Sequence, residues 1–97
     1  MTIYGYARVS TAHQENDLQI DALTRAGAQS IIQEKASGVR SRKELAALLA
    51  KLQPGDCVLV YKLDRFARSL LDLLGIIAKI EAARATFRSL TESIDTA

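Results

Sequence analysis

Five consecutive residues, Cys57-Val58-Leu59-Val60-Tyr61, decide the fold of this sequence. They are apolar on both faces of an extended chain, which is typical of a central strand in a sheet that is covered on both sides. Pro54-Gly55 ends the helical pattern before them, and a polar loop follows from Lys62 to Ser69. Cys57 is the chain's one cysteine, so no internal disulfide can form, and we expect a small buried hydrophobe.

Strand and helix patterns alternate on either side of this segment. Strands are expected at 3–9, 30–33 and 86–90, and helices at 15–26, 41–53 and 69–84. Ser41 with Glu44, and Ser69 with Asp72, form capping boxes before the second and third helices, and Gly27 ends the first. The segment 34–41 has the composition of a mobile loop. The order β-α-β-α-β-α-β predicts an α/β fold, three layers α/β/α, with a four-stranded, mainly parallel sheet.

The third predicted helix is apolar around most of its circumference and keeps only a narrow polar stripe of Arg68, Asp72 and Lys79. A helix of this kind is buried on nearly all sides, whereas one small sheet covers only one side. We therefore expect part of its surface to meet a partner subunit or a segment beyond Ala97.

Composition limits the class of protein. The 97 residues are 48% apolar and 25% charged, which fits one ordinary globular domain. The longest apolar runs are far shorter than the roughly 20 residues of a membrane-spanning helix. The N-terminus begins with a strand pattern and lacks the layout of a signal peptide, so we expect a cytoplasmic location.

The charges are distributed unevenly along the chain. Loops that follow parallel strands emerge at one edge of the sheet, here the segments 8–14, 34–43 and 62–69. These segments hold eight of the 13 basic residues and two of the 11 acidic ones, so the edge carries +6 and the rest of the chain −4. Five of the eight are arginines, which favours forked hydrogen bonds to phosphate oxygens. A solvated charged rim is the plainer alternative.

Three features of this edge suggest a site, and each has a simpler interpretation. Ser10 follows Arg8 off the first strand, where a hydroxyl would project among arginines, although many such serines only serve turns. Asp64-Arg65 with Arg68 precedes a helix N-terminus, which favours anions, but the three could form a structural ion-pair network. Ser37-Gly38 could be a flap over a ligand, or simply a loop.

Other chemistries are disfavoured. The sequence has no glycine-rich nucleotide fingerprint and no phosphate-cradling Gly-Lys-Ser/Thr loop, so we expect no nucleotide cofactor. His13 is the only histidine, and we interpret it as an exposed bystander. Glu34 and Asp64, the acids of this edge, each adjoin a basic residue. We therefore expect no metal and no cofactor.

Several separated blocks together resemble the resolvase/invertase family of serine site-specific recombinases, in the family's order over essentially the whole chain. They are Tyr6-Ala7-Arg8-Val9-Ser10-Thr11, Gln14, Asp17-Leu18-Gln19, Glu34-Lys35-Ala36-Ser37-Gly38, Arg42-Lys43-Glu44-Leu45, Gly55-Asp56, Lys62-Leu63-Asp64-Arg65-Phe66-Ala67-Arg68-Ser69, Ser89-Leu90 and Ile94-Asp95-Thr96. Glu34 stands where members of the family often have Asp.

The resemblance implies a DNA strand transferase for inversion or resolution, in which a serine attacks a DNA phosphodiester and forms a 5′-phosphoserine intermediate. By matching positions, Ser10 is the nucleophile, Arg8, Arg65 and Arg68 surround the phosphate, and Arg42 lies close by. The supporting residues implied are Asp64, Gln14, Gln19, Tyr6 and Ser37. Asp64 either handles a proton together with an arginine or only orients Arg65.

The resemblance also implies what partners to expect: double-stranded DNA, and homodimers that pair into a tetramer. Family members continue into a dimerisation helix and a helix-turn-helix DNA-binding domain, which residues 1–97 do not contain. We therefore expect 1–97 to be a catalytic domain cut short, inactive or weakly active alone. Two other functions stay open: a non-catalytic module that binds a nucleic-acid backbone, and a regulatory domain that binds a small phosphorylated ligand.

Overall fold

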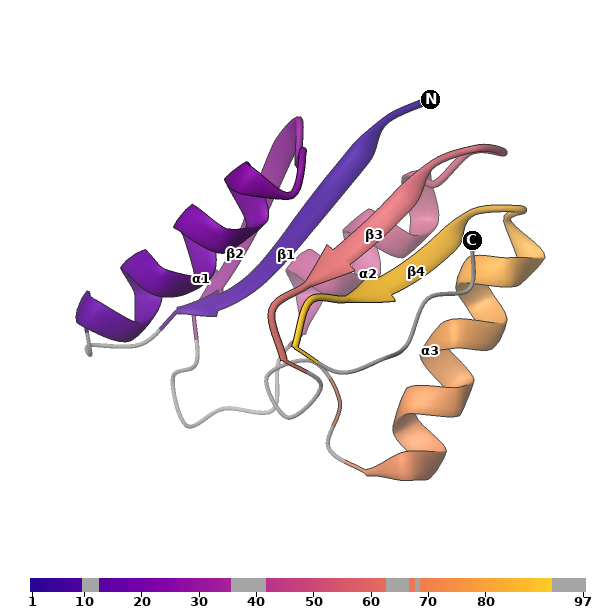
Figure 1. Ribbon diagram of the computed structural model, residues 1–97. Helices are drawn as coiled ribbons and strands as arrows, with labels where there is room; N and C mark the ends of the chain where they lie inside the picture. The colour runs from indigo at the N-terminus through magenta and orange to yellow at the C-terminus, as the bar shows by residue number, and fades with distance from the viewer. Residues whose placement is uncertain (10–12, 36–41, 63–66, 68, 92–97) are drawn as a thin grey trace.

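The computed structural model describes residues 1–9, 13–35, 42–62, 67 and 69–91, without the side chains of 13–15. Strands and helices alternate along the chain as predicted (Figure 1). In order they are β1 (Ile3–Val9), α1 (His13–Arg25), β2 (Ser30–Lys35), α2 (Lys43–Lys51), β3 (Cys57–Val60), α3 (Leu70–Ala82) and β4 (Thr86–Ser89). One boundary prediction was wrong in a way that matters: Glu34 and Lys35 belong to β2 and not to a loop.

The four strands form one sheet in the order β2-β1-β3-β4, and every neighbouring pair is parallel. β1 and β3 are therefore the central strands, which confirms the prediction from the two-sided apolar run at 57–61. The register pairs Arg8 with Glu34, and Val9 with Lys35, at the carboxyl ends of β1 and β2. These two strand ends thus lie side by side at one edge, which we call the carboxyl edge.

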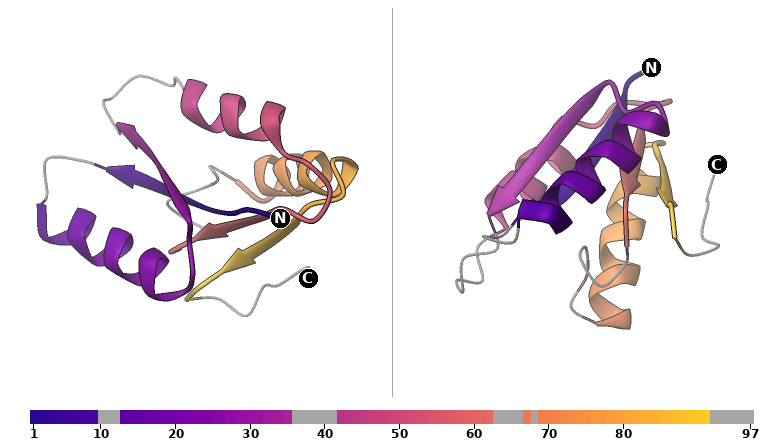
Figure 2. Two further views of the ribbon diagram at one scale, coloured as in Figure 1. Left: turned by 90° about the horizontal axis from the view of Figure 1, so that it is seen from above. Right: turned by 60° about the vertical axis from the view of Figure 1, so that its left-hand side comes forward.

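Helices cover both faces of the sheet, so the predicted three-layer architecture is confirmed (Figure 2). Alternate residues of β3 face opposite layers: Val58 and Val60 pack in the larger core with α2 and α3, whereas Leu59 packs in the smaller core with α1. β1 divides in the same way, with Tyr6 in the larger core and Ala7 in the smaller. Both strands are thus held from two sides by burial of apolar surface.

The smaller core depends on a close approach between β1 and the end of α1. A Cβ added at Gly5 would lie 3.2 Å from Ala28 Cβ and 3.3 Å from Leu23 Cβ. Gly27 lies just after α1 and has φ +102°, a conformation that favours glycine. This agrees with its predicted place after the helix. α1 can therefore lie against the strand that leads into the carboxyl edge.

α3 begins with the predicted cap, since Ser69 Oγ accepts a hydrogen bond of 3.1 Å from the backbone N–H of Asp72. One side of this helix is buried through Leu73, Ile76 and Ile80. Its other side exposes a patch of leucines, which are 53–82% accessible: Leu70, Leu71 and Leu74. The expectation that the sheet covers only one side of this helix is confirmed. Within the described ranges, no helix is long and apolar enough to cross a membrane.

Two glycines give a matched test of this packing. Gly5→Ala should lower the free energy of unfolding by about 1–3 kcal/mol, because the new methyl group overpacks against Leu23 and Ala28. Gly75→Ala should raise it by about 0.5–1 kcal/mol, because Gly75 lies within α3 with nothing within 4 Å of the added Cβ. Urea unfolding of both variants measures the difference. Equal effects would contradict the close approach of α1 to β1.

Candidate active site at the carboxyl edge

The carboxyl edge brings together segments that are distant in sequence. The carboxyl ends of the strands and the starts of α2 and α3 lie at the same side of the molecule (Figure 1). Five of the eight basic residues predicted for this edge are within the described residues: Arg8, Lys35, Arg42, Lys43 and Lys62. Arg8 is partly buried at the end of β1, and Arg42 immediately precedes α2.

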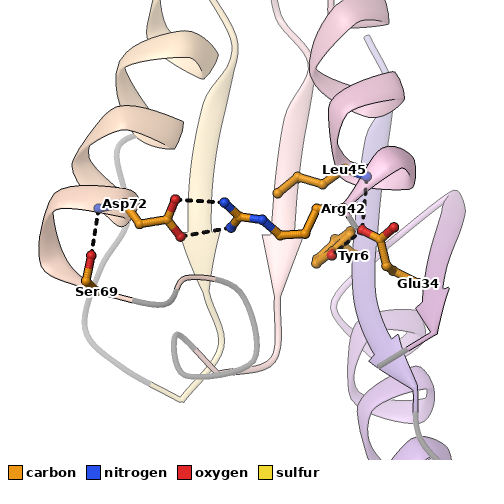
Figure 3. Close-up of polar contacts among 6 residues, drawn as sticks. All are labelled: Tyr6, Glu34, Arg42, Leu45, Ser69 and Asp72. Atoms are coloured by element: carbon orange, nitrogen blue, oxygen red, sulfur yellow. Dashed lines mark hydrogen bonds and ion pairs between the residues drawn. The ribbon is translucent and has the colours of Figure 1, made fainter. Parts of the chain in front are cut away.

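A buried carboxylate joins three elements at this edge (Figure 3). Glu34, 4% accessible at the end of β2, accepts a 2.7 Å hydrogen bond from the Tyr6 hydroxyl of β1. It also accepts hydrogen bonds from the first turn of α2, of 3.0 Å from the backbone N–H of Glu44 and 3.2 Å from that of Leu45. These N–H groups have no partner within the helix itself, so Glu34 acts as the cap of α2.

This arrangement corrects the capping box predicted at Ser41 and Glu44. Ser41 lies outside the described residues, and the residue in the N-cap position is Arg42, whose side chain makes no capping hydrogen bond. The acceptor is instead the carboxylate of Glu34, ten residues before Glu44, because the fold places the end of β2 next to the start of α2. A pattern of neighbouring residues cannot reveal a cap supplied from another element.

Tyr6 is fixed in its protonated form by this contact. Its side chain is 1% accessible. Burial, and then the hydrogen bond to the Glu34 carboxylate and its charge, raise the pKa of Tyr6 far above its ordinary value, although Arg8 and Arg42 act in the opposite direction. The tyrosine predicted as a supporting residue is therefore a hydrogen-bond donor that holds Glu34 in place.

Gln19 supports the end of β1 from the opposite face of the sheet. The side chain of Gln19, on α1, is 1% accessible, and its Nε2 donates a 2.9 Å hydrogen bond to the carbonyl oxygen of Arg8. Two buried atoms nearby, Gln19 Oε1 and Arg8 Nε, have no hydrogen-bond partner among the residues described. A buried donor without a partner is costly, so Arg8 retains an unused capacity to bind an acceptor.

Arg42 makes a forked ion pair with Asp72 in the first turn of α3 (Figure 3). Nη1 and Nη2 of Arg42 each donate a 2.8 Å hydrogen bond to one carboxylate oxygen of Asp72. The hydrogen bonds to Asp72 raise the pKa of Arg42 above its ordinary value. Because both side chains are about four-fifths buried, this pair is shielded from water more than a surface ion pair.

Four of the predicted site residues thus have described side chains: Tyr6, Arg8, Gln19 and Arg42. The structure brings all four to the carboxyl edge: Tyr6 through its hydrogen bond to Glu34, Arg42 through its ion pair with Asp72, and Arg8 and Gln19 at the end of β1. Gln14 lies in α1, but its side chain is not described. The remaining predictions fall outside the described residues: Ser10, Ser37, Asp64, Arg65 and Arg68.

Two residues of this edge received no site role from the sequence. Glu34 was noted as an acid beside a basic residue and as a position where family members often have Asp, and Asp72 as part of a helix cap and of the polar stripe of its helix. An acidic residue at the carboxyl end of a strand that leads into a helix is the signal that could have revealed Glu34. No local signal pairs Asp72 with Arg42, because 30 residues separate them.

The chain matches known proteins over nearly its full length. Residues 3–97 match the family model described as "Resolvase, N terminal domain". Serine recombinase gin of Escherichia phage Mu is 45% identical over 95 residues, which cover 97% of this chain and 49% of that protein. DNA-invertase hin of Salmonella typhimurium is 42% identical over 97 residues, covering 99% of this chain and 51% of that one.

The fold likewise matches a solved structure. A resolvase family site-specific recombinase from Streptococcus pneumoniae superposes with a TM-score of 0.80 at 21% identity, over 99% of this chain and 76% of that chain. This likeness supports the three-layer fold. The chain spans about half the length of the phage Mu and Salmonella relatives.

The Tyr6–Glu34 hydrogen bond has a pH-dependent consequence. Tyr6→Phe should lower the free energy of unfolding by about 1–2 kcal/mol at neutral pH, because a buried carboxylate loses one of its donors. The raised pKa means that above about pH 10 the unfolded tyrosine loses its proton while the folded one retains it, so the advantage of Tyr6 should shrink as the pH rises.

Urea unfolding at several pH values measures this change. Tyr4→Phe on the same strand is the matched control and should cost little, since its ring, with Lys51 stacked over it, is retained. A cost of Tyr6→Phe that grew above pH 10 would contradict the hydrogen bond.

Proposed function

Since the chain belongs to the resolvase family through its N-terminal domain, we propose that it is the catalytic domain of a site-specific DNA recombinase. The chain would cut and rejoin double-stranded DNA through a serine nucleophile. A DNA substrate agrees with the cytoplasmic location expected from the sequence, which stays a prediction.

The proposed chemistry is a pair of phosphoryl transfers. The Ser10 hydroxyl loses its proton and its oxygen attacks a backbone phosphorus; an O–P bond forms, the bond to the 3′ oxygen breaks, and that oxygen takes up a proton. The products are a 5′-phosphoserine ester and a free 3′-OH. After strand exchange a 3′-OH attacks the ester and releases Ser10, so the bond energy is conserved and no ATP is needed.

The observation that carries this proposal is that Arg8 and Arg42 both lie at the carboxyl edge, near enough for their charges to act on Tyr6, where Val9 ends β1 immediately before Ser10. Phosphoryl transfer requires positioning and neutralisation of charge on the phosphate oxygens, which guanidinium groups can supply. Arg8 Nε is a buried donor with no partner among the described residues, and an acceptor that reached it would satisfy it. Arg65 and Arg68 would complete the phosphate site.

The exposed leucines of α3 support the proposed assembly. Leu70, Leu71 and Leu74 form an exposed apolar patch on a helix whose opposite side is buried through Leu73, Ile76 and Ile80. We propose that this patch is covered in the dimers and tetramers in which recombination takes place. The proposed catalytic domain would then work together with other copies of itself.

A covalent adduct tests the assignment of Ser10. We would prepare a hybrid in which residues 1–97 replace the matching half of the phage Mu relative, and incubate it with nicked recombination-site DNA. We expect a covalent protein–DNA adduct that resists denaturation in a gel. Ser10→Ala should abolish the adduct completely, because no other hydroxyl would be in line with the phosphate.

Ser30→Ala is the matched control, because Ser30 starts β2 at the opposite end of the sheet. Its adduct should equal that of the parent hybrid. An adduct that survives Ser10→Ala would overturn the assignment. If residues 1–97 alone bind duplex DNA with steep salt dependence and no hybrid ever forms an adduct, the chain is instead a module that binds the nucleic-acid backbone.

A further inference from the structure

The Arg42–Asp72 pair is anchored at both ends. The Asp72 backbone N–H is held by Ser69 Oγ at 3.1 Å in the first turn of α3. Arg42 precedes the first turn of α2, whose N–H groups at Glu44 and Leu45 are held by Glu34. The two caps fix the backbone from which each side chain extends, and the two hydrogen bonds of the fork then give the guanidinium a defined position at the carboxyl edge.

Asp72 occupies only one end of this guanidinium. It accepts one hydrogen bond from each terminal nitrogen, which leaves Nε–H and one N–H on each terminal nitrogen. Within the described part of the chain, no further hydrogen bond of the Arg42 side chain is recorded. A phosphate oxygen could bind these remaining donors without displacing the carboxylate.

We propose that Asp72 is a positioning residue, which holds the Arg42 guanidinium so that its remaining N–H groups bind the phosphodiester. Arginine has a long side chain, and ordering it costs conformational entropy when the phosphate binds. Because Asp72 already orders it, that cost is met during folding, and binding is tighter. This inference rests on the proposed function, from which it takes the bound DNA phosphate. It adds a residue from α3 to the site.

The proposal makes a counter-intuitive prediction. By charge alone, removal of the Asp72 carboxylate should strengthen the attraction of the edge for an anion. If Asp72 instead positions the Arg42 guanidinium, removal of the carboxylate should weaken binding of the anion. The sign of the change in affinity therefore separates the two roles.

The test is a titration of the 97-residue chain with dimethyl phosphate, followed by NMR through the arginine Nε–H signals. We expect the Arg42 and Arg8 signals to shift together in a saturable manner. Asp72→Asn should weaken the affinity about tenfold, which corresponds to the loss of one well-placed charge-assisted hydrogen bond. Asp72→Asn keeps the backbone N–H that donates to Ser69, so the start of α3 is retained.

Two further variants control for stability and for charge. Asp21→Asn makes the same change in the exposed Asp21–Arg25 ion pair on α1 and should leave the affinity unchanged. Arg42→Lys keeps the positive charge without the fork; it should weaken binding to a similar extent, and adding Asp72→Asn should cause no further loss. Thermal unfolding confirms that each variant is folded.

The outcomes distinguish this inference from the proposed function. Unchanged or tighter binding in Asp72→Asn overturns the positioning role, as does a shift of the Arg8 signal with none at Arg42; in both cases the phosphate site at the edge stands. If neither arginine responds to dimethyl phosphate, the proposed phosphate site fails, and this inference fails with it.

Discussion

The buried Glu34 carboxylate is the interaction on which the carboxyl edge depends. A carboxylate removed from water must have its hydrogen bonds supplied by the protein. The Tyr6 hydroxyl and the N–H groups of Glu44 and Leu45 supply them from β1 and from α2. Satisfying this one group therefore fixes the beginning of α2 against the end of β2.

A series of contacts extends from that carboxylate across the edge. Glu34 fixes the first turn of α2, Arg42 directly precedes that turn, and the Arg42 fork reaches Asp72 at the beginning of α3. On the other face of the sheet, Gln19 secures the carbonyl of Arg8. The two described arginines of the site are thus fixed by contacts from β2, α1 and α3, so the geometry of the site follows from how the layers pack.

Much of the fold could be predicted from the sequence because its signals are local. The two-sided apolar run at 57–61 predicted a central strand, and β3 divides its side chains between both cores. The Ser69 cap required only a hydroxyl three residues before a backbone N–H in the first turn of the helix. Glu34 could not be predicted in this way. The segment 34–41 that contains it has the composition of a loop, and the role of Glu34 depends on partners 10 and 28 residues away in sequence.

The location of the site was predicted from charge and from family resemblance. The partners of its residues could not be predicted in either way. A count of basic residues finds Arg42 at the edge but cannot show that a carboxylate from α3 holds it. The pair lies beside a hollow of about 340 Å³ that Leu71 also lines, next to the exposed leucines of α3. A surface that covers Leu71 removes water from the neighbouring ion pair, and the lower dielectric strengthens the attraction between its charges. The first turn of α3 carries both exposed leucines and the carboxylate that holds Arg42, so a partner on this apolar surface would also cover the ion pair.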